Sequence, residues 1–339
     1  MIDDSTGYIF LRRFSATTEK EVVAALDTLL SNGMKRLLFD LRGNSGGYLE
    51  QAAAISDQFI TTIDTLVYTM GKIKESNQVF RSSKSKVRGD YSLIVMINRG
   101  SASASEIVSG AVQDLDRGLV VGETSFGKGL VQRQLPLDTG SAIRVTIARY
   151  YTHSGRLIQR PYEDGNDLAY YRELYETDRE SKMDSLKELR PKFKTKSGRT
   201  VYGGGGITPD IYIPVKSTIN IETAKVLRNP KRPFFNFTSK RAVNYKDKFD
   251  SFDEFKKGWD VPDSLFKSFL DHLESDSIDV VKDSLSRDID YISNRIKSEL
   301  AGSIWGKNES TNLRLLMDNQ VSEALKHFNE ADAFIKSIN

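Results

Sequence analysis

Residues 92–107 read Ser-Leu-Ile-Val-Met-Ile-Asn-Arg-Gly-Ser-Ala-Ser-Ala-Ser-Glu-Ile. The apolar first half, residues 92–98, is typical of a strand that is buried on both faces. From Ser103 to about Asp116 the apolar residues recur at helical spacing instead. These helix positions are Ile107, Val108, Ala111, Val112 and Leu115. A serine at such a strand-to-helix corner lies beside N–H groups that have no partner within the helix and that can stabilise a developing oxyanion.

The same corner also fits a purely structural role. Ser103-Ala-Ser-Glu106 has the residues of a capping box, in which the serine and the glutamate bond the first N–H groups of a helix. On this segment alone, the cap and the nucleophile both remain open for Ser103.

The segments around this corner predict an α/β fold. Further strands are predicted at residues 7–14, 36–41, 119–122 and 141–151, after Gly129, and near 211–214. Helices are predicted from Thr17-Thr18 to about Leu30, before Asn32-Gly33, and from Leu49 to about Phe59. Strands that alternate with helices favour α/β layering.

The chain divides into two predicted domains. Residues 1–215 form the α/β core, which a polar, charged and Tyr-rich insertion interrupts at about 162–200. From about residue 216 the apolar spacing becomes helical, which predicts a separate helical domain over 216–339. Its apolar faces, such as Leu265 with Phe269 and Ile292 with Ile296, favour an internal core, and self-association through this domain is the alternative.

Composition excludes several classes of function. The chain has 339 residues, no cysteine, three histidines and a net charge of +3. The absence of cysteine excludes disulfides, thiolate catalysis and cysteine-based zinc sites. With only three histidines, a Ser-His-Asp triad or a His-rich metal site is not expected. The small net charge does not indicate binding to nucleic acid. We therefore expect no metal and no cofactor.

No run of 18 apolar residues exists, and the acidic first residues are not a signal peptide.

A second segment supplies a candidate base. It reads Gly122-Glu-Thr-Ser-Phe-Gly-Lys-Gly-Leu-Val-Gln132, so Lys128 stands between two glycines. A phosphate-binding P-loop would need Ser or Thr after the lysine, and Gly129 stands there, while a solvated surface lysine remains an alternative. A lysine acts as a base only when burial lowers its pKa, and Phe126, Leu130 and Val131 could provide a dry setting. Gln132 could hold the amine in place.

A third segment, residues 39–48, ends a predicted buried strand in the turn that contains Gly46 and Gly47. A backbone N–H of this turn could face a substrate carbonyl, and a plain tight turn is the alternative.

Together the three segments resemble the carboxy-terminal processing, or tail-specific, proteases of peptidase family S41. The matching motifs are Leu41-Arg-Gly-Asn-Ser-Gly-Gly47, Ser101-Ala-Ser-Ala-Ser-Glu106 and Gly122 to Gln132, with further matches at Tyr150–Gln159 and Gly205–Asp210. In the family the nucleophile lies twenty-five positions before the lysine and the orienting glutamine four positions after it. The resemblance therefore implies Ser103 as nucleophile, Lys128 as base and Gln132 as the orienting residue. It also implies an oxyanion hole built from the backbone of Ala104 and of the Gly46-Gly47 turn, with the choice of glycine open.

The resemblance extends over about residues 6–215 and carries further expectations. It implies a core related to the ClpP/crotonase-like spiral of ββα units, endoproteolysis of protein or peptide substrates with accessible C-termini, and a periplasmic or cell-envelope location. The family's usual PDZ domain does not fit in the residues before Gly7, so we expect that domain and any targeting segment to lie outside this chain. Ser45 and His153 stand where the family usually has proline, and a histidine base is not expected. The alternative is a resting or inactive module of this fold that binds proteins as a scaffold.

Overall fold

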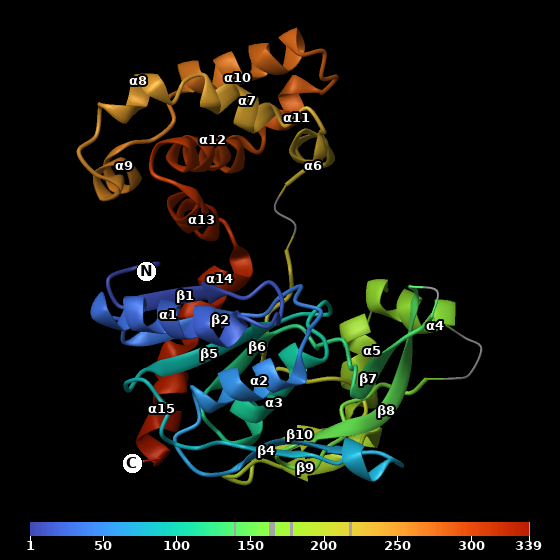
Figure 1. Cartoon of the computed structure of the whole chain (residues 1–339). Helices are drawn as coiled ribbons and strands as arrows, with labels where there is room; N and C mark the ends of the chain where they lie inside the picture. Colours follow the sequence, from blue (N-terminus) through green and yellow to red (C-terminus); the bar gives the residue numbers. More distant parts are fainter. Residues whose placement is uncertain (139, 163–166, 177–178, 217–218, 339) are drawn as a thin grey trace. The chain divides into compact units, whose positions relative to one another are not determined.

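The computed structural model of the chain describes residues 1–138, 140–162, 167–176, 179–216 and 219–338. They form two compact units (Figure 1). The first unit comprises Met1–Pro214 together with Ala324–Asn339, and the second comprises Val215–Glu323. The two units are described separately below.

The first unit is built around a five-stranded parallel sheet. Its strand order is β1 (Thr6–Phe10), β2 (Arg36–Asp40), β5 (Ser92–Ile97), β6 (Leu119–Gly122) and β11 (Ile211–Tyr212). Every residue of the central strand β5 is buried, as expected for a parallel sheet that is covered on both faces. The α/β prediction is confirmed, and the carboxyl end of β5 leads directly to the candidate serine.

Three helices cover one face of this sheet. They are α1 (Thr18–Ser31), α2 (Leu49–Asp57) and α3 (Ala104–Asp114). Leu26 of α1, Ile55 of α2 and Ile107 of α3 share one hydrophobic core with Val95 of β5. This packing fixes the start of α3 against the end of β5, so the corner between them is held rigidly.

The C-terminal helix α15 (Phe328–Ile338) belongs to the first unit and packs against β5. Phe328 and Ala331 are buried, and the side chains of Asp332 and Ser92 are hydrogen-bonded. The structure thus differs from the expected helical domain of 216–339, since the second unit ends at Glu323. The reason is physical: the second face of a parallel sheet has to be covered, and α15 covers it at β5.

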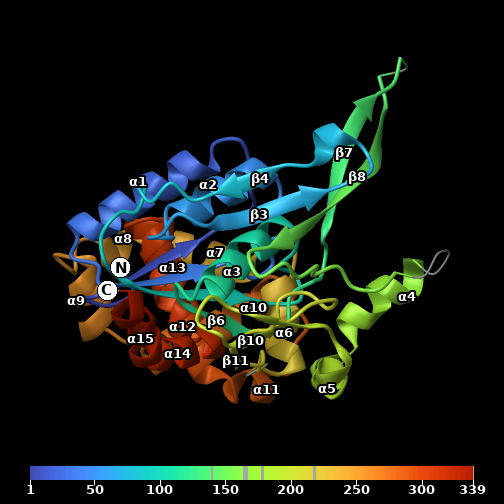
Figure 2. The same ribbon diagram turned by 90° about the horizontal axis from the view of Figure 1, so that it is seen from below.

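A second, antiparallel sheet lies beside the first in the same unit. Its order is β4 (Val79–Arg81), β3 (Thr65–Met70), β8 (Ala142–Thr152) and β7 (Leu130–Pro136). β3 pairs only with the last residues of β8, so most of the β7–β8 hairpin projects from the unit (Figure 2). The sequence predicted β7 and β8 but not β3 and β4. Their short segments lack a long apolar run, and β4 lies at the edge of the sheet.

The charged insertion contains helix, as predicted. It includes α4 (Asp167–Arg172), α5 (Arg179–Leu186), β9 (Lys192–Lys194) and β10 (Thr200–Tyr202). Residues 163–166 and 177–178 of the predicted insertion lie outside the described residues. The antiparallel pair of β9 and β10 was not predicted from the sequence.

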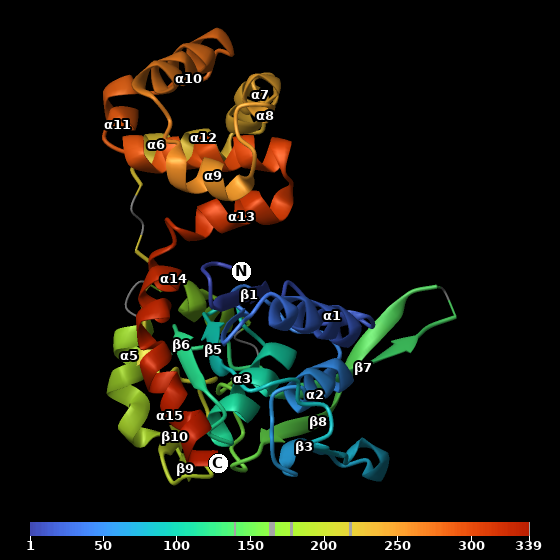
Figure 3. The same ribbon diagram turned by 90° about the vertical axis from the view of Figure 1, so that its left-hand side faces the viewer.

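The second unit is helical, as expected (Figure 3). Its helices are α6 (Ile221–Arg228), α7 (Pro233–Ser239), α8 (Val243–Lys246), α9 (Phe252–Gly258), α10 (Asp263–Ser275), α11 (Lys282–Ser286), α12 (Ile289–Ile304), α13 (Lys307–Leu315) and α14 (Asn319–Ala324). Leu265, Phe269, Ile292 and Ile296 all lie in its hydrophobic core, so these faces are internal. Among the described residues, every helix is too short or too polar to cross a bilayer.

Candidate active site

Ser103 lies at the corner where β5 ends and α3 begins. It is the N-cap of α3, and its N–H donates a hydrogen bond of 2.8 Å to Glu106 Oε2, as the capping-box pattern predicts. Its backbone has φ +55° and ψ −112°, a conformation that costs a residue with a side chain about 1–3 kcal/mol. Such strain is concentrated at functional sites, and a cap alone does not require it.

The two neighbouring serines have structural roles. Ser101 Oγ donates to Leu41 O at 2.8 Å, and Ser105 Oγ donates to Asn44 O at 2.8 Å. Both side chains are fully buried, whereas Ser103 is partly exposed. The three serines of the motif therefore separate into two that hold the 41–47 turn and one that a substrate can reach.

Glu106 joins the serine segment to the lysine segment. Its carboxylate is fully buried and accepts hydrogen bonds from the N–H groups of Ser103 (2.8 Å), Gly127 (2.6 Å) and Lys128 (2.9 Å), and from Ser125 Oγ (2.5 Å). Burial, the largest influence, raises the pKa of Glu106, and these hydrogen bonds oppose that rise. Because one rigid carboxylate holds both backbones, the positions of Ser103 and Lys128 are coupled.

Lys128 is half-buried at the start of the β7 segment. Its Nζ donates a hydrogen bond of 3.2 Å to Gln132 Oε1. Burial lowers the pKa of Lys128, the positive charge of Arg144 lowers it further, and the negative charge of Glu106 opposes both effects. The lowered pKa favours the neutral amine that a general base needs.

Tyr150 also connects the serine segment to the lysine segment. Its hydroxyl lies 2.5 Å from Lys128 O and 3.1 Å from Ser103 O, and burial raises its pKa well above the usual value, so it remains a neutral donor. In the described part of the chain no hydrogen bond joins Ser103 Oγ to Lys128 Nζ. Catalytic hydrogen bonds often tighten only when substrate is bound, so this geometry is compatible with a dyad.

The glycine turn lies directly against the serine. A side chain on Gly46 would come within 2.7 Å of Ala102 O and 2.8 Å of Ser103 Cβ, so only glycine permits this approach. The Gly46 N–H donates to Asn44 Oδ1 at 2.9 Å and is therefore occupied. Within the described residues, the N–H groups of Gly47 and Ala104 have no hydrogen-bond partner. These two N–H groups are therefore available to a substrate oxygen.

A pocket of about 1030 Å³ opens beside Lys128. It extends from Ser45 and Ala102 along the hairpin to the insertion. Leu130, Gln132 and Leu157 line it, together with the aromatic side chains of Phe126, Tyr162, Tyr170 and Tyr171. A pocket of this size accommodates several side chains of a peptide.

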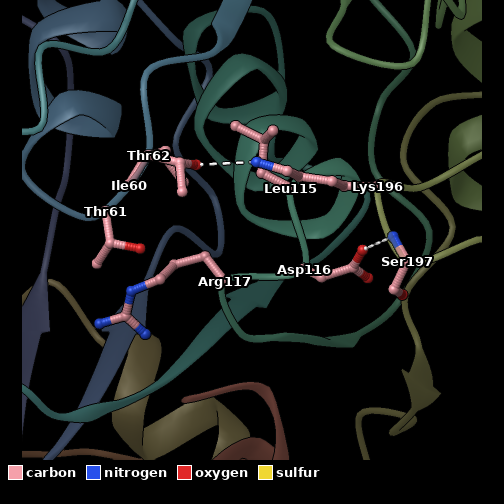
Figure 4. A pocket seen from close by; sticks show the side chains of 8 residues that line it. All are labelled: Ile60, Thr61, Thr62, Leu115, Asp116, Arg117, Lys196 and Ser197. Atoms are coloured by element: carbon pink, nitrogen blue, oxygen red, sulfur yellow. Dashed lines mark hydrogen bonds between the residues drawn. The ribbon is translucent and has the colours of Figure 1, made fainter. Parts of the chain in front are cut away.

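A second pocket, of about 300 Å³, lies between Ile60, Leu115 and Ser197 (Figure 4). Its charged groups already have partners within the chain: Lys196 Nζ lies 2.8 Å from Asp64 Oδ2, and Asp116 accepts from the Ser197 N–H at 2.5 Å. In Figure 4 the Arg117 guanidinium points away from the other lining side chains. We therefore take the pocket beside Lys128 as the candidate site.

Comparison with known families gives one match over this region. Residues 5–164 match the model of peptidase family S41. This part of the chain is therefore similar to the S41 peptidases. Residues 231–306 of the second unit match a family of unknown function, DUF8443.

The same region is similar to several carboxy-terminal processing proteases. The chain is 41% identical to the carboxyl-terminal-processing protease of Synechocystis sp. over 148 residues, which cover 44% of this chain and 34% of that protein. It is 39% identical to the carboxy-terminal-processing protease of Bartonella bacilliformis over 162 residues, which cover 47% of this chain and 37% of that protein. The chain thus spans about a third of the length of these relatives.

Among solved structures, the photosystem II D1 C-terminal processing protease is 26% identical, with a TM-score of 0.44. That match covers 62% of this chain and 42% of the other.

Several side chains at the pocket beside Lys128 were not predicted from the sequence. Arg144 and Arg149 belong to β8. The sequence of this segment predicted a strand but gave no indication that its arginines line a pocket. Tyr170 and Tyr171 come from α4 in the insertion, which is held near the pocket by the ion pair of Arg160 with Glu173 (2.9 Å). The one signal in the sequence was the tyrosine-rich composition of the insertion.

His153 lies outside this pocket. Its Nδ1 is 3.0 Å from Thr65 O on β3, and it does not line the space beside Lys128. The expectation that no histidine serves as the base remains a prediction about chemistry, and the position of His153 is compatible with it.

Proposed function

We propose that this chain is a serine endopeptidase of the carboxy-terminal processing type, with Ser103 as nucleophile and Lys128 as general base. The single observation that carries the proposal is the environment of Ser103. It is the partly exposed serine of its motif, it has a strained backbone, and it lies against the Gly46 turn. Among the described residues, the N–H groups of Gly47 in this turn and of Ala104 have no hydrogen-bond partner.

In the proposed reaction Ser103 Oγ attacks the carbonyl carbon of the scissile peptide bond. Neutral Lys128 accepts the serine proton, and its ammonium form then donates that proton to the leaving amine. The oxyanion of the tetrahedral intermediate accepts hydrogen bonds from the Gly47 and Ala104 N–H groups. Loss of the amine leaves an acyl-enzyme on Ser103, which water hydrolyses with Lys128 again as base. Gln132 orients the lysine amine through its side-chain oxygen.

The proposed substrates are proteins or peptides with accessible C-termini, as the names of the relatives suggest. A periplasmic or cell-envelope location is proposed on the same resemblance. Fractionation of cells that express the natural protein, followed by immunodetection, would test the location, and a purely cytosolic signal would contradict it.

A fluorophosphonate probe tests the nucleophile directly. We expect one probe molecule per chain, mapped by peptide mass spectrometry to Ser103, and no labelling of Ser103→Ala. Ser45→Ala is the matched control, because Ser45 is an exposed serine in the adjacent turn, and it should label like the wild type. Labelling of Ser103→Ala at the wild-type rate would overturn the assignment.

The lysine base predicts a specific pH dependence. Activity requires neutral Lys128, so kcat/KM should rise with pH through the pKa of this residue, which lies below the usual lysine value. In Arg144→Gln a positive neighbour is lost, protonated Lys128 becomes less unfavourable, and its pKa rises. The rising limb of the profile should therefore move to higher pH. We would measure it with an uncharged peptide substrate, and a shift to lower pH would contradict the assignment.

A further inference from the structure

The pocket beside Lys128 is lined by cations and by no acidic side chain among the described residues. Its charged lining consists of Lys128, Arg144, Arg149 and Arg160. Lys128 is neutral in the active form proposed above, which leaves the arginines, because their guanidinium groups remain charged at any physiological pH.

Two of these arginines have no ion-pair partner. Arg160 is buried, pairs with Glu173 at 2.9 Å, and stacks over Tyr170 at 4.2 Å from the ring centre, so its charge is already compensated. Arg144 and Arg149 are exposed, and neither forms an ion pair within the described part of the chain. A pocket with unpaired guanidinium groups favours an anionic occupant.

The pairing of the hairpin places these two arginines on opposite sides of Gln132. Gln132 lies opposite Thr146, while Arg144 lies opposite Gln134, toward the tip, and Arg149 lies opposite Leu130, toward the core. At the rise of a strand, the Cα atoms of the two arginines are roughly 15 Å apart. With their Cα atoms this far apart along the strand, the two arginines can contact different parts of an extended substrate.

Part of the pocket lining is a cluster of aromatic side chains, called the aromatic wall below. Phe126, Tyr162, Tyr170 and Tyr171 pack on one another with ring centres 5.5–6.3 Å apart. Tyr162 and Tyr171 are exposed and present ring surface. Such a wall takes an apolar or aromatic side chain of the substrate.

We propose that this pocket selects acidic peptide segments, with Arg144 and Arg149 each binding a carboxylate and the aromatic wall taking an apolar or aromatic residue of the same segment. The inference rests on the proposed peptidase function and names its substrate class. The carboxylates come from Asp or Glu side chains or from the C-terminus of the substrate, which offer the same group to a guanidinium.

The test uses the full chain and a set of matched fluorogenic peptides. In each peptide one position near the cleavage site is Glu, Gln or Lys, and the C-terminus is either free or amidated. We expect kcat/KM for the best Glu peptide to exceed that of its Gln counterpart by roughly tenfold or more, as for a hydrogen bond between charged groups. A preference that depends only on the free C-terminus would assign the carboxylate to the chain end. Equal rates for Glu, Gln and Lys peptides with either terminus would overturn the inference and leave the peptidase function standing.

Charge reversal separates recognition from a structural role. Arg144→Glu and Arg149→Glu should each invert the preference at a different substrate position, so that Lys exceeds Gln there. Arg133→Glu is the matched control, because Arg133 is an exposed arginine of the same hairpin outside the pocket lining. It should keep the wild-type preference. Arg144→Gln and Arg149→Gln, which remove charge without adding any, should abolish the preference without inverting it.

A binding measurement keeps the two proposals apart. Fluorescence anisotropy with Ser103→Ala reports peptide affinity without turnover, and the Glu peptide should bind roughly tenfold more tightly than the Gln peptide. If no peptide is cleaved by the wild type but this difference in affinity is seen, the acidic site stands and the peptidase proposal fails. Equal affinities for Glu, Gln and Lys peptides would overturn the acidic site.

Discussion

Replacing Lys128 by methionine is expected to lower kcat/KM by about 10³-fold, the typical contribution of a general base. Methionine keeps much of the length and packing of the lysine but has no amine to accept the Ser103 proton. The loss should appear mainly in kcat, because the backbone N–H of residue 128 still bonds Glu106. Steady-state kinetics on one peptide, with the wild type measured in parallel, would provide both parameters.

Lys128→Arg gives the sharper version of this experiment. Arginine keeps the positive charge and reaches at least as far, but it cannot lose its proton at the pH of the assay. We expect it to be as inactive as methionine, since charge alone does not replace a base. Lys192→Met, at an exposed lysine of β9, is the control and should behave as the wild type. Near-normal activity of Lys128→Arg would mean that another group accepts the proton.

Replacing Glu106 by alanine should lower the free energy of unfolding by about 3–5 kcal/mol, because it removes a buried charged acceptor and leaves several donors without a partner. Those donors include the N–H groups of Ser103, Gly127 and Lys128. Chemical denaturation followed by circular dichroism would measure the loss. Glu50→Ala, at an exposed position of α2, is the matched control and should change stability by less than about 0.5 kcal/mol.

The same variant should also lose activity under conditions in which it is still folded. Without the shared carboxylate, the Ser103 and Lys128 backbones are free to move apart, so kcat should fall well before unfolding is detected. Wild-type stability together with wild-type kcat would show that Glu106 does not couple the two segments.

The choice of Ser103 among three serines illustrates what the sequence could provide. The family resemblance selected Ser103 by its spacing to Lys128, which is not in itself a physical reason. The structure adds one: Ser101 and Ser105 are buried and their hydroxyls hold the neighbouring turn. Hydrogen bonds from Ser101 to Leu41 and from Ser105 to Asn44 span about sixty residues of chain, and no local pattern predicts such contacts.

The oxyanion donors show a similar division. The sequence pointed to Ala104 and to a glycine of the turn, but it left Gly46 and Gly47 equivalent. In the structure the side chain of Asn44 occupies the Gly46 N–H, which leaves that of Gly47 available. The distinction depends on the side-chain conformation of Asn44 within this turn. A sequence motif does not specify such a conformation. Its catalytic use stays a prediction.

The pocket wall and the last helix were beyond sequence reasoning for a different reason. Tyr170 and Tyr171 read as part of a polar insertion, and nothing local indicates that they return to Phe126. The apolar positions of α15 fit a helical domain as well as they fit a sheet, because amphipathic spacing identifies a buried face but not its partner.

The position of α15 has a consequence for how the protein is made. The first unit is discontinuous in sequence, with the whole of Val215–Glu323 inserted between its sheet and its last helix. Domains form as their residues leave the ribosome, N-terminal parts first. When Ser103 and Lys128 have both emerged, the α15 side of β5 is therefore still uncovered, and more than a hundred further residues have to be synthesised before Phe328 and Ala331 can cover it. All residues of the helical unit are therefore synthesised before the first unit can be completed. The candidate residues Ser103 and Lys128 emerge early, and the helix that completes the fold around their sheet emerges last.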